Sequence, residues 1–204
     1  MPVASELEKL GVSVIPPRGR PSCFSYVFSG DPVIVVDPGF NFEEIAEKIQ
    51  KAPKIVVILT HSHADHSTGA VFLAEKFGCL VYASQNADFS KDSTLEQWFG
   101  EDLGGLRELG KNGKIKKLKD GDRIGNENFS FTVLETPGHS ADSLCLLEEK
   151  KKILVSGDSL ENYRDDLPAS DPEEHEKSID RADALLWKTG GKFWRLTGHS
   201  LGRT

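Results

Sequence analysis

Short runs of apolar, mostly β-branched residues recur along the chain, separated by polar and glycine-containing stretches. Runs of this kind, about four to eight residues long, are typical of strands. We expect strands at Val33–Val36, Ile55–Leu59, Leu80–Tyr82, Phe129–Leu134, Leu144–Leu147, Ile153–Val155 and Phe193–Leu196. Apolar and polar residues alternate in Phe129–Leu134, which predicts one buried face. Ile55–Leu59 is apolar throughout, which predicts a strand covered on both faces.

Two amphipathic stretches in the first half of the chain have recognisable helix ends. Asn41 and Glu44 have the spacing of a capping box, so we expect a helix to begin there. Ser67 or Thr68 is expected to begin a second helix, and Gly78 to end it, because glycine readily adopts the left-handed conformation that follows a helix.

The second half of the chain contains one further strong helix signal. Asp171–Pro172 is expected to begin a helix that ends at Gly190–Gly191. The segment Asn86–Gly113 is mixed, and we expect a helix around Ser93–Phe99 followed by glycine-rich loops. Strands and helices thus alternate at both ends of the chain around a mainly β middle, which predicts an α/β protein with helices outside its sheets.

Composition and charge narrow the class of protein. A length of 204 residues suits one sizeable core, so we expect a single domain over residues 1–204. The formal net charge of -7 disfavours nucleic acid as a partner. We find neither an apolar stretch long enough to span a bilayer nor the features of a signal peptide, so we expect no membrane association and a cytoplasmic location. The three cysteines, Cys23, Cys79 and Cys145, are widely spaced and fit buried thiols in a reducing compartment.

The segment from His61 to His66 carries the strongest chemical signal. It follows an expected buried strand and precedes an expected helix, so it forms the connecting loop. His61 and His63 are two residues apart and share one face of an extended backbone. Asp65 and His66 then lie where the chain turns into the helix. Imidazole nitrogens suit zinc or iron, and a carboxylate adds a charged oxygen ligand, so this loop predicts a metal site.

Three more residues of the metal-ligating types follow expected strands. His139, Asp158 and His199 each lie beside a glycine or another turn residue. Ligands at the ends of neighbouring strands come together along one rim of a sheet. Five of the six histidines in the chain fall in this pattern, and the sixth, His175, lies near the start of the last helix, where we expect it to be partly exposed.

The motif His-x-His-x-Asp-His, with the later His, Asp and His, resembles the metallo-β-lactamase superfamily and most resembles its glyoxalase II-like hydrolases. The likeness extends from about Val33 to His199. It implies an αββα sandwich of two mixed β-sheets, with helices on the outer faces and the site at one edge of the sheets. It also implies which residues hold the metals: His61, His63 and His139 one ion, Asp65, His66 and His199 the other, with Asp158 bridging the two. Asp37, in Asp37-Pro38-Gly39, matches an early family Asp that supports the site, although a plain turn residue is an equally good interpretation.

Differences from the family's motifs indicate which branches of the superfamily the chain resembles less. Position 63 is His, where di-iron flavoproteins tend to have Glu, and position 158 is Asp, where many antibiotic-cleaving lactamases have Cys. The chain ends soon after His199, so we expect no glutathione-binding helical domain and an acyl substrate unlike a glutathione conjugate. We also considered Tyr163 and Arg164 as residues that border the substrate, and Trp98 and Phe99 as part of a lid.

The resemblance leads us to expect a metal-dependent hydrolase with two Zn²⁺ ions. It would cleave a thioester, ester or lactone of a small-molecule substrate with a metal-bridging hydroxide. Asp65 and Asp158 are the expected catalytic carboxylates, and no separate organic cofactor is expected. The alternative is a persulfide dioxygenase with one Fe²⁺ on His61, His139 and Asp158, and a phosphodiesterase or nuclease is a weaker third possibility. The sequence leaves the oligomeric state open.

Overall fold

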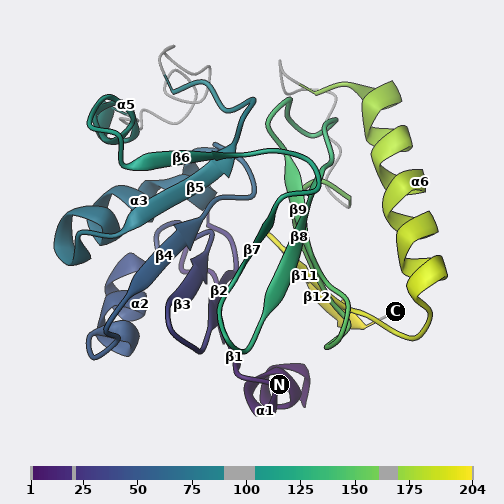
Figure 1. The fold of residues 1–204 in the computed structure, drawn as a ribbon, viewed down its shortest axis with the longest axis horizontal. Coiled ribbons are helices and arrows are strands. Elements are labelled where there is room, and N and C mark those ends of the chain that lie inside the picture. Colours follow the sequence, from purple (N-terminus) through teal and green to yellow (C-terminus); the bar gives the residue numbers. More distant parts are fainter. Residues whose placement is uncertain (1, 20–21, 90–103, 161–169, 204) are drawn as a thin grey trace.

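The computed structural model describes residues 2–19, 22–89, 104–160 and 170–203 of the chain, and it contains two six-stranded sheets (Figure 1). The first sheet has the order β1-β2-β3-β4-β5-β6. Its strands are β1 (Val12–Ile15), β2 (Ser25–Phe28), β3 (Val33–Val36), β4 (Ile55–Ile58), β5 (Leu80–Ser84) and β6 (Ile115–Leu118). The pairs from β1 to β3 are antiparallel and those from β3 to β6 are parallel, so this sheet is mixed.

The second sheet is also mixed and has the order β12-β11-β10-β9-β8-β7. Its strands are β7 (Arg123–Gly125), β8 (Ser130–Glu135), β9 (Leu144–Glu148), β10 (Ile153–Gly157), β11 (Trp194–Thr197) and β12 (Leu201–Arg203). Only β10 and β11 run parallel, and the other neighbours are antiparallel. The two sheets face each other across the middle of the molecule (Figure 1).

Helices cover the outer faces of both sheets. On one side lie α2 (Phe42–Ile49), α3 (Ala64–Phe77) and α5 (Gly104–Lys111), and on the other side lies α6 (Pro172–Thr189), at the right of Figure 1. The short helix α1 (Pro2–Lys9) lies near the β1 edge. The expected αββα sandwich is therefore confirmed, with helices outside and two mixed sheets inside.

The apolar side chains form three layers, because successive residues of a strand point to opposite faces of its sheet. In β3, Val35 packs under the helices α2 and α3, while Ile34 and Val36 point into the space between the sheets. The central layer also contains Phe131 and Leu146 from the second sheet. A third cluster lies beneath α6. The candidate site residues lie on the loops that follow the strands and on the first turn of α3.

The strand predictions are confirmed, and several of the helix predictions need correction. All seven expected strands exist, with ends that differ by at most two residues. Helix α3 begins at Ala64, not at Ser67 or Thr68, with His63 as its N-cap. Its predicted end is confirmed, because Gly78 is left-handed, with φ 68°. The expected loop at Gly104–Lys111 is wrong, because these residues form α5.

The capping box at Asn41 is also wrong. Its side chain makes no cap hydrogen bond to α2. Instead, Nδ2 of Asn41 donates to the Cys23 carbonyl at 3.0 Å and to Ser25 Oγ at 3.1 Å, so the residue ties α2 to the segment before β2. By contrast, Asp171 caps α6 as predicted, because its carboxylate accepts the backbone N–H groups of Glu173 and Glu174 at 3.0 Å each.

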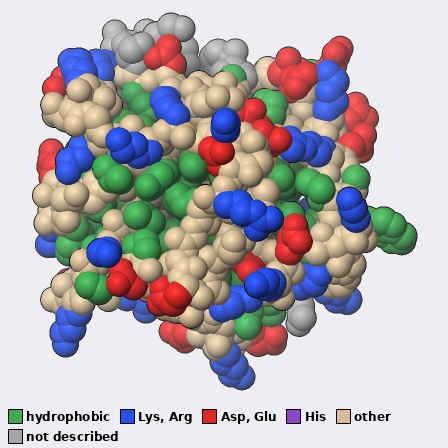
Figure 2. Space-filling view, in the orientation of Figure 1, with side chains coloured by type: hydrophobic (Ala, Val, Ile, Leu, Met, Phe, Trp, Pro, Cys, Tyr) green, Lys and Arg blue, Asp and Glu red, His purple; other side chains and the backbone are tan. Residues whose placement is uncertain are grey.

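The structure also bears on the expectations for the cysteines, for membrane-spanning segments, for surface charge and for the helix at Ser93–Phe99. Cys23, Cys79 and Cys145 are buried free thiols, as predicted. Within the described part of the chain, no helix has both the length and the apolar character needed to cross a membrane. Acidic and basic side chains are interspersed over the face seen in Figure 2. The expected helix at Ser93–Phe99 lies outside the described residues.

Candidate metal centre

Four of the seven predicted site residues come from one short connection. His61 and His63 lie in the loop between β4 and α3, and Asp65 and His66 lie in the first turn of α3. The early start of α3 places Asp65 and His66 on a helical turn, so their side chains have a fixed direction. His63, as the N-cap residue, has an extended backbone with ψ 141°. This change from extended to helical backbone is what lets four neighbouring side chains converge.

The other three residues come from the second sheet. His139 follows β8, Asp158 follows β10, and His199 follows β11. Gly157, just before Asp158, has φ 51°, a left-handed backbone conformation that glycine adopts at little cost. The side chains of all seven predicted residues meet at one end of the sandwich, between the two sheets.

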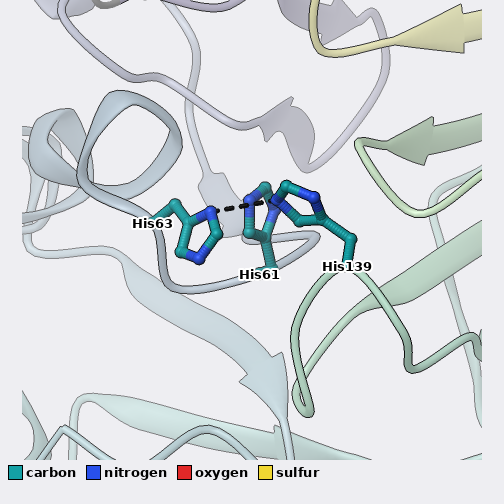
Figure 3. Close-up of side chains that lie close together, drawn as sticks. All are labelled: His61, His63 and His139. Carbon is teal, nitrogen blue, oxygen red and sulfur yellow. Dashed lines mark hydrogen bonds between the residues drawn. The ribbon is translucent and has the colours of Figure 1, made fainter. Parts of the chain in front are cut away.

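His61, His63 and His139 form the first group of potential ligands. Each offers one nitrogen, and the three nitrogens lie within 4.8 Å of one another. Figure 3 shows the three rings converging from two separate loops, with Nε2 of His139 3.0 Å from Nδ1 of His63. The ring centroids of His61 and His63 are 4.4 Å apart, and those of His61 and His139 are 4.9 Å apart. The three imidazole nitrogens thus face one point.

Asp65, His66 and His199 form the second group. Their ligand-type atoms also lie within 4.8 Å of one another. Nε2 of His66 lies 3.8 Å from Oδ2 of Asp65, and Nε2 of His199 lies 3.6 Å from the same oxygen. The side chain of His66 is fully buried, whereas that of His199 is 40% exposed. The second group therefore opens toward solvent at His199.

Asp158 lies between the two groups and contacts both. Its Oδ2 is 3.7 Å from Nε2 of His139 in the first group and 3.2 Å from Nε2 of His199 in the second. Its Oδ1 is 3.5 Å from Nε2 of His66. One carboxylate thus reaches both triads, which is the position that a bridging ligand requires.

A second carboxylate, Asp37, supports the cluster from behind. Oδ2 of Asp37 lies 2.9 Å from Nδ1 of His66, and both side chains are buried. Asp37 also accepts hydrogen bonds from the backbone N–H and the hydroxyl of Thr60, at 2.8 Å and 2.7 Å. Its backbone is left-handed, with φ 49°, a conformation in which Asp and Asn are enriched among non-glycine residues. Asp37 is therefore the supporting residue suggested by the sequence rather than only a turn residue.

Thr60 was not singled out by the sequence, although it precedes the motif directly. Its hydroxyl lies 3.1 Å from Nδ1 of His61 as well as 2.7 Å from Asp37. This contact turns the other ring nitrogen, Nε2, of His61 toward the cluster. The signal that could have revealed Thr60 is its position at the end of a buried strand, where an unpaired hydroxyl would be costly.

The electrostatic environment differs among the cluster residues. Burial, with help from the neighbouring His66, His63 and His139, holds the pKa of His61 well below its ordinary value. The pKa of His199 is raised, first by its hydrogen bond to Asp158 and despite partial burial. Burial would raise the pKa of Asp158, but the surrounding histidines, His66 first, lower it well below its usual range. At neutral pH Asp158 is therefore an ionised carboxylate, and His61 is an uncharged imidazole that can serve as a metal ligand.

The buried polar atoms of the cluster fit a metal centre. Nε2 of His61, Nε2 of His66 and Oδ1 of Asp158 are buried and have no hydrogen-bond partner in the described structure. Leaving a buried polar atom unpaired costs about 1–3 kcal/mol, and three such atoms aimed at one place suit metal coordination. In addition, a hydrogen on the hydrogen-bonded Nδ1 of His66 leaves Nε2 free as a ligand, which is the common carboxylate–histidine–metal arrangement.

The remaining candidate residues lie outside the described part of the chain or outside the cluster. Tyr163 and Arg164, like Trp98 and Phe99, lie outside the described residues. His175 is partly exposed, as expected, but its helix packs directly against the loop that carries His139. A Cβ at Gly138 would overlap the backbone of His175.

Comparison with known proteins agrees with this cluster. The family model described as the metallo-beta-lactamase superfamily matches residues 18–186. A probable metallo-hydrolase from Streptococcus pyogenes is 31% identical over 166 residues, covering 73% of this chain and 67% of the relative. Hydroxyacylglutathione hydrolase GloC from Haemophilus influenzae is 30% identical over 151 residues, covering 68% of each protein.

Solved structures lead to the same family. The crystal structure of TTHA1623 in a di-iron-bound form has a TM-score of 0.69 and 25% sequence identity to this chain, covering 92% of both chains. The match of fold and family extends over the segments that carry the candidate ligands from His61 to Asp158. The chain belongs to the metallo-β-lactamase superfamily and is a metal-binding hydrolase.

Proposed function

We propose that the protein is a dinuclear zinc hydrolase that cleaves a thioester, ester or lactone. The observation that carries this proposal is the position of Asp158, whose carboxylate reaches Nε2 of His139 in one triad and Nε2 of His66 and His199 in the other. A single-metal site would need only one of these triads. In the proposal His61, His63 and His139 hold one ion, Asp65, His66 and His199 hold the other, and Asp158 bridges them.

The chain supplies charge and orientation for this chemistry. Two divalent ions would act as Lewis acids toward the substrate carbonyl and would favour deprotonation of water at neutral pH. Asp65 and Asp158 offset part of the positive charge and keep the two ligand groups close together. Asp65, partly exposed beside His199, is also placed to accept a hydrogen bond from the attacking water and so to orient it. Asp37 and Thr60 fix the rings of His66 and His61.

The proposed substrate is a small acyl compound. The relatives named hydroxyacylglutathione hydrolase act, by that name, on a thioester of glutathione, which supports the thioester class for this chain. Hydrolysis would add water across the acyl carbon–sulfur or carbon–oxygen bond and release a carboxylic acid with a thiol or an alcohol. The formal charge of -7 supports a small molecule rather than nucleic acid as the substrate.

The identity of the metal must be part of the test, because the structurally similar TTHA1623 was solved in a di-iron-bound form. The protein would be depleted of metal and reloaded with zinc or with iron(II). Each form would be assayed with thioesters, including S-lactoylglutathione, and with esters, lactones and a phosphodiester, while oxygen uptake is recorded with a persulfide.

We expect the zinc-loaded protein to hydrolyse at least one thioester, ester or lactone with saturation, and to leave the phosphodiester intact. Oxygen uptake with a persulfide by the iron form alone, without acyl hydrolysis by the zinc form, would overturn the proposal in favour of the dioxygenase. Turnover of the phosphodiester alone would favour a nuclease-type activity.

A further inference from the structure

The turn that carries His139 is held by hydrogen bonds within the turn and by contacts with α6. It lies between β8 and β9, where the backbone N–H of Thr136 donates to the carbonyl of Ser143 at 3.0 Å. The N–H of Ser143 donates back to the carbonyl of Ser140 at 3.3 Å, which closes a tight turn just after His139. The direction of the His139 side chain therefore depends on how firmly this turn is fixed.

Asp142 ends a chain of buried hydrogen bonds inside this turn. The hydroxyl of Ser140 donates to Oδ1 of Asp142 at 2.8 Å. Since the Ser140 proton goes to the carboxylate, the hydroxyl of Ser143 donates to Ser140 Oγ, 2.7 Å away. Ser143 Oγ in turn accepts the backbone N–H of Ser140 at 3.2 Å. The three residues are almost completely buried, with 6% of Asp142 exposed.

Burying the Asp142 carboxylate in this turn is energetically unfavourable. Oδ2 of Asp142 is buried and has no hydrogen-bond partner in the described structure, which is costly for a charged group. The nearest compensation described is electrostatic. Burial lowers the pKa of Lys117, and the charges of Asp142 and Asp88 act on it in the opposite direction, so the lysine on β6 lies within range of the carboxylate.

The opposite side of the same turn is held by α6. The backbone N–H of Asp171 donates to the carbonyl of Gly138 at 2.7 Å, and the hydroxyl of Ser178 donates to the carbonyl of Pro137 at 2.7 Å. The residues before His139 are thus fixed by α6, and the residues after it are fixed by the chain of hydrogen bonds that ends at Asp142. Without the latter, the part of the turn after His139 would be held by backbone hydrogen bonds alone.

We propose that Asp142 is a positioning residue for the metal centre: through Ser140 and Ser143 it holds His139 toward His61 and His63. This inference rests on the proposed metal centre. It assigns a role to a carboxylate outside the predicted ligand set. Its loss should lower the affinity for the ion held by His61, His63 and His139 and leave the affinity for the other ion unchanged.

The first test compares metal affinity in Asp142→Ala, Asp142→Asn and the unsubstituted chain by competition with a chromophoric chelator. We expect Asp142→Ala to bind one of two zinc ions about 10–100-fold more weakly, the usual effect of losing a supporting hydrogen bond. Asp142→Asn keeps an oxygen that accepts from Ser140, so it should bind both ions like the unsubstituted chain. Asp183→Ala, which removes an ion pair between α6 and Arg195 of β11, is the matched control and should change neither affinity.

A double-mutant cycle separates positioning from general stability. If Asp142 acts through His139, Asp142→Ala should add little to the loss caused by His139→Ala, but should add fully to the loss caused by His199→Ala. If Asp142 only stabilised the fold, Asp142→Ala would weaken the binding of both ions, and its effect would add fully to that of either histidine substitution. Ser143→Ala breaks the same chain of hydrogen bonds and leaves the carboxylate, so it gives the same prediction if Asp142→Ala does not fold.

The outcomes are distinguishable from those for the proposed function. If the unsubstituted chain binds no metal, the proposed function itself fails. If it binds two ions and Asp142→Ala binds both with unchanged affinity, only the role of Asp142 is overturned. Equal loss in the Asn and Ala variants would also overturn it, because the hydrogen bond from Ser140 would then not be the cause.

Discussion

Asp37 and His66 form a fully buried pair in which Oδ2 of the carboxylate lies 2.9 Å from Nδ1 of the imidazole. The pair fixes the ring of His66 so that its Nε2, which has no hydrogen-bond partner in the described structure, faces Asp158. Asp37 is itself fixed by the backbone N–H and hydroxyl of Thr60. The orientation of a candidate ligand is therefore set by residues behind the cluster.

This relationship makes Asp37→Asn an informative variant. Asn also tolerates the left-handed backbone found here, so the change removes charge and alters hydrogen bonding without adding strain. We expect the affinity for the metal held by His66 to fall about 10–100-fold. Chelator competition measures this fall. Unchanged affinity for both ions would show that the Asp37–His66 pair does not orient a ligand.

Loss of Asp158 should be more damaging than loss of Asp37. Asp158 reaches both triads, whereas Asp37 contacts only His66 among the seven candidate ligands. We expect Asp158→Asn to lose at least one metal ion and to lower kcat/KM more than Asp37→Asn does. The two variants would be compared at a fixed zinc concentration with metal content measured in parallel. Near-normal activity with two ions bound to Asp158→Asn would contradict the bridging role.

Gly198 provides a steric test of the same site. A Cβ added there would meet Oδ1 of Asp158 and would lie 2.6 Å from Cε1 of His66. We therefore expect Gly198→Ala to displace these side chains and to reduce metal content and activity. Gly202→Ala is the matched control, because a Cβ at that position has no heavy atom within 4 Å. If Gly198→Ala binds metal as well as the control does, the arrangement around Asp158 is wrong.

Metal binding should depend on pH differently at the two groups. A histidine binds metal in its neutral form, so protons compete with the metal. The pKa of His199 is raised, mainly by its hydrogen bond to Asp158, while burial lowers the pKa of His61. Although burial lowers it, the pKa of His66 is raised well above its ordinary value by nearby charges that include Asp158 and Asp37. As pH falls, His66 and His199 therefore become protonated before His61, and the ion of the Asp65–His66–His199 group should be released at a higher pH than the other.

The measurement for this prediction is chelator competition at a series of values between about pH 8 and pH 5. Two separate release steps are expected. In His199→Ala the step at higher pH should disappear, because that ion is already weakly held. Release of both ions in one step, unchanged by the His199 substitution, would contradict the assignment of the two groups.

The sequence predicts the framework of the fold well because its strands are short apolar runs bounded by turn residues. Val33–Val36 was predicted with the observed ends. The helix start at Ser67 or Thr68 was wrong, because His63 at the N-cap has no capping side chain and the helix begins within the metal motif. Local sequence signals do not reveal a helix start that lacks a capping side chain.

Other errors arise where tertiary contacts override local signals. Asn41 has the spacing of a capping residue, yet its amide is used to hold Cys23 and Ser25. The glycines of Gly104–Lys111 suggested a loop, but Gly105 packs so closely against Val71 of α3 that a larger residue would not fit. Local patterns carry no information on such packing.

The seven candidate ligands could be named from the sequence because each is a residue of metal-ligating type in a segment that follows a strand. Their supporting residues are harder to identify. No sequence motif marks Thr60 or Asp142 as supporting residues. The structure places Thr60 beside His61 and Asp142 in the turn after His139. The prediction of one domain over residues 1–204 stays a prediction.

The metal content of the purified chain distinguishes a dinuclear centre from a single-ion site. It would be measured by elemental mass spectrometry on protein freed of loosely bound metal, together with His139→Ala and His199→Ala, which each remove one ligand from a different group. We expect two zinc ions per chain and about one in each variant. One iron per chain, lost in His139→Ala and retained in His199→Ala, would contradict the dinuclear hydrolase.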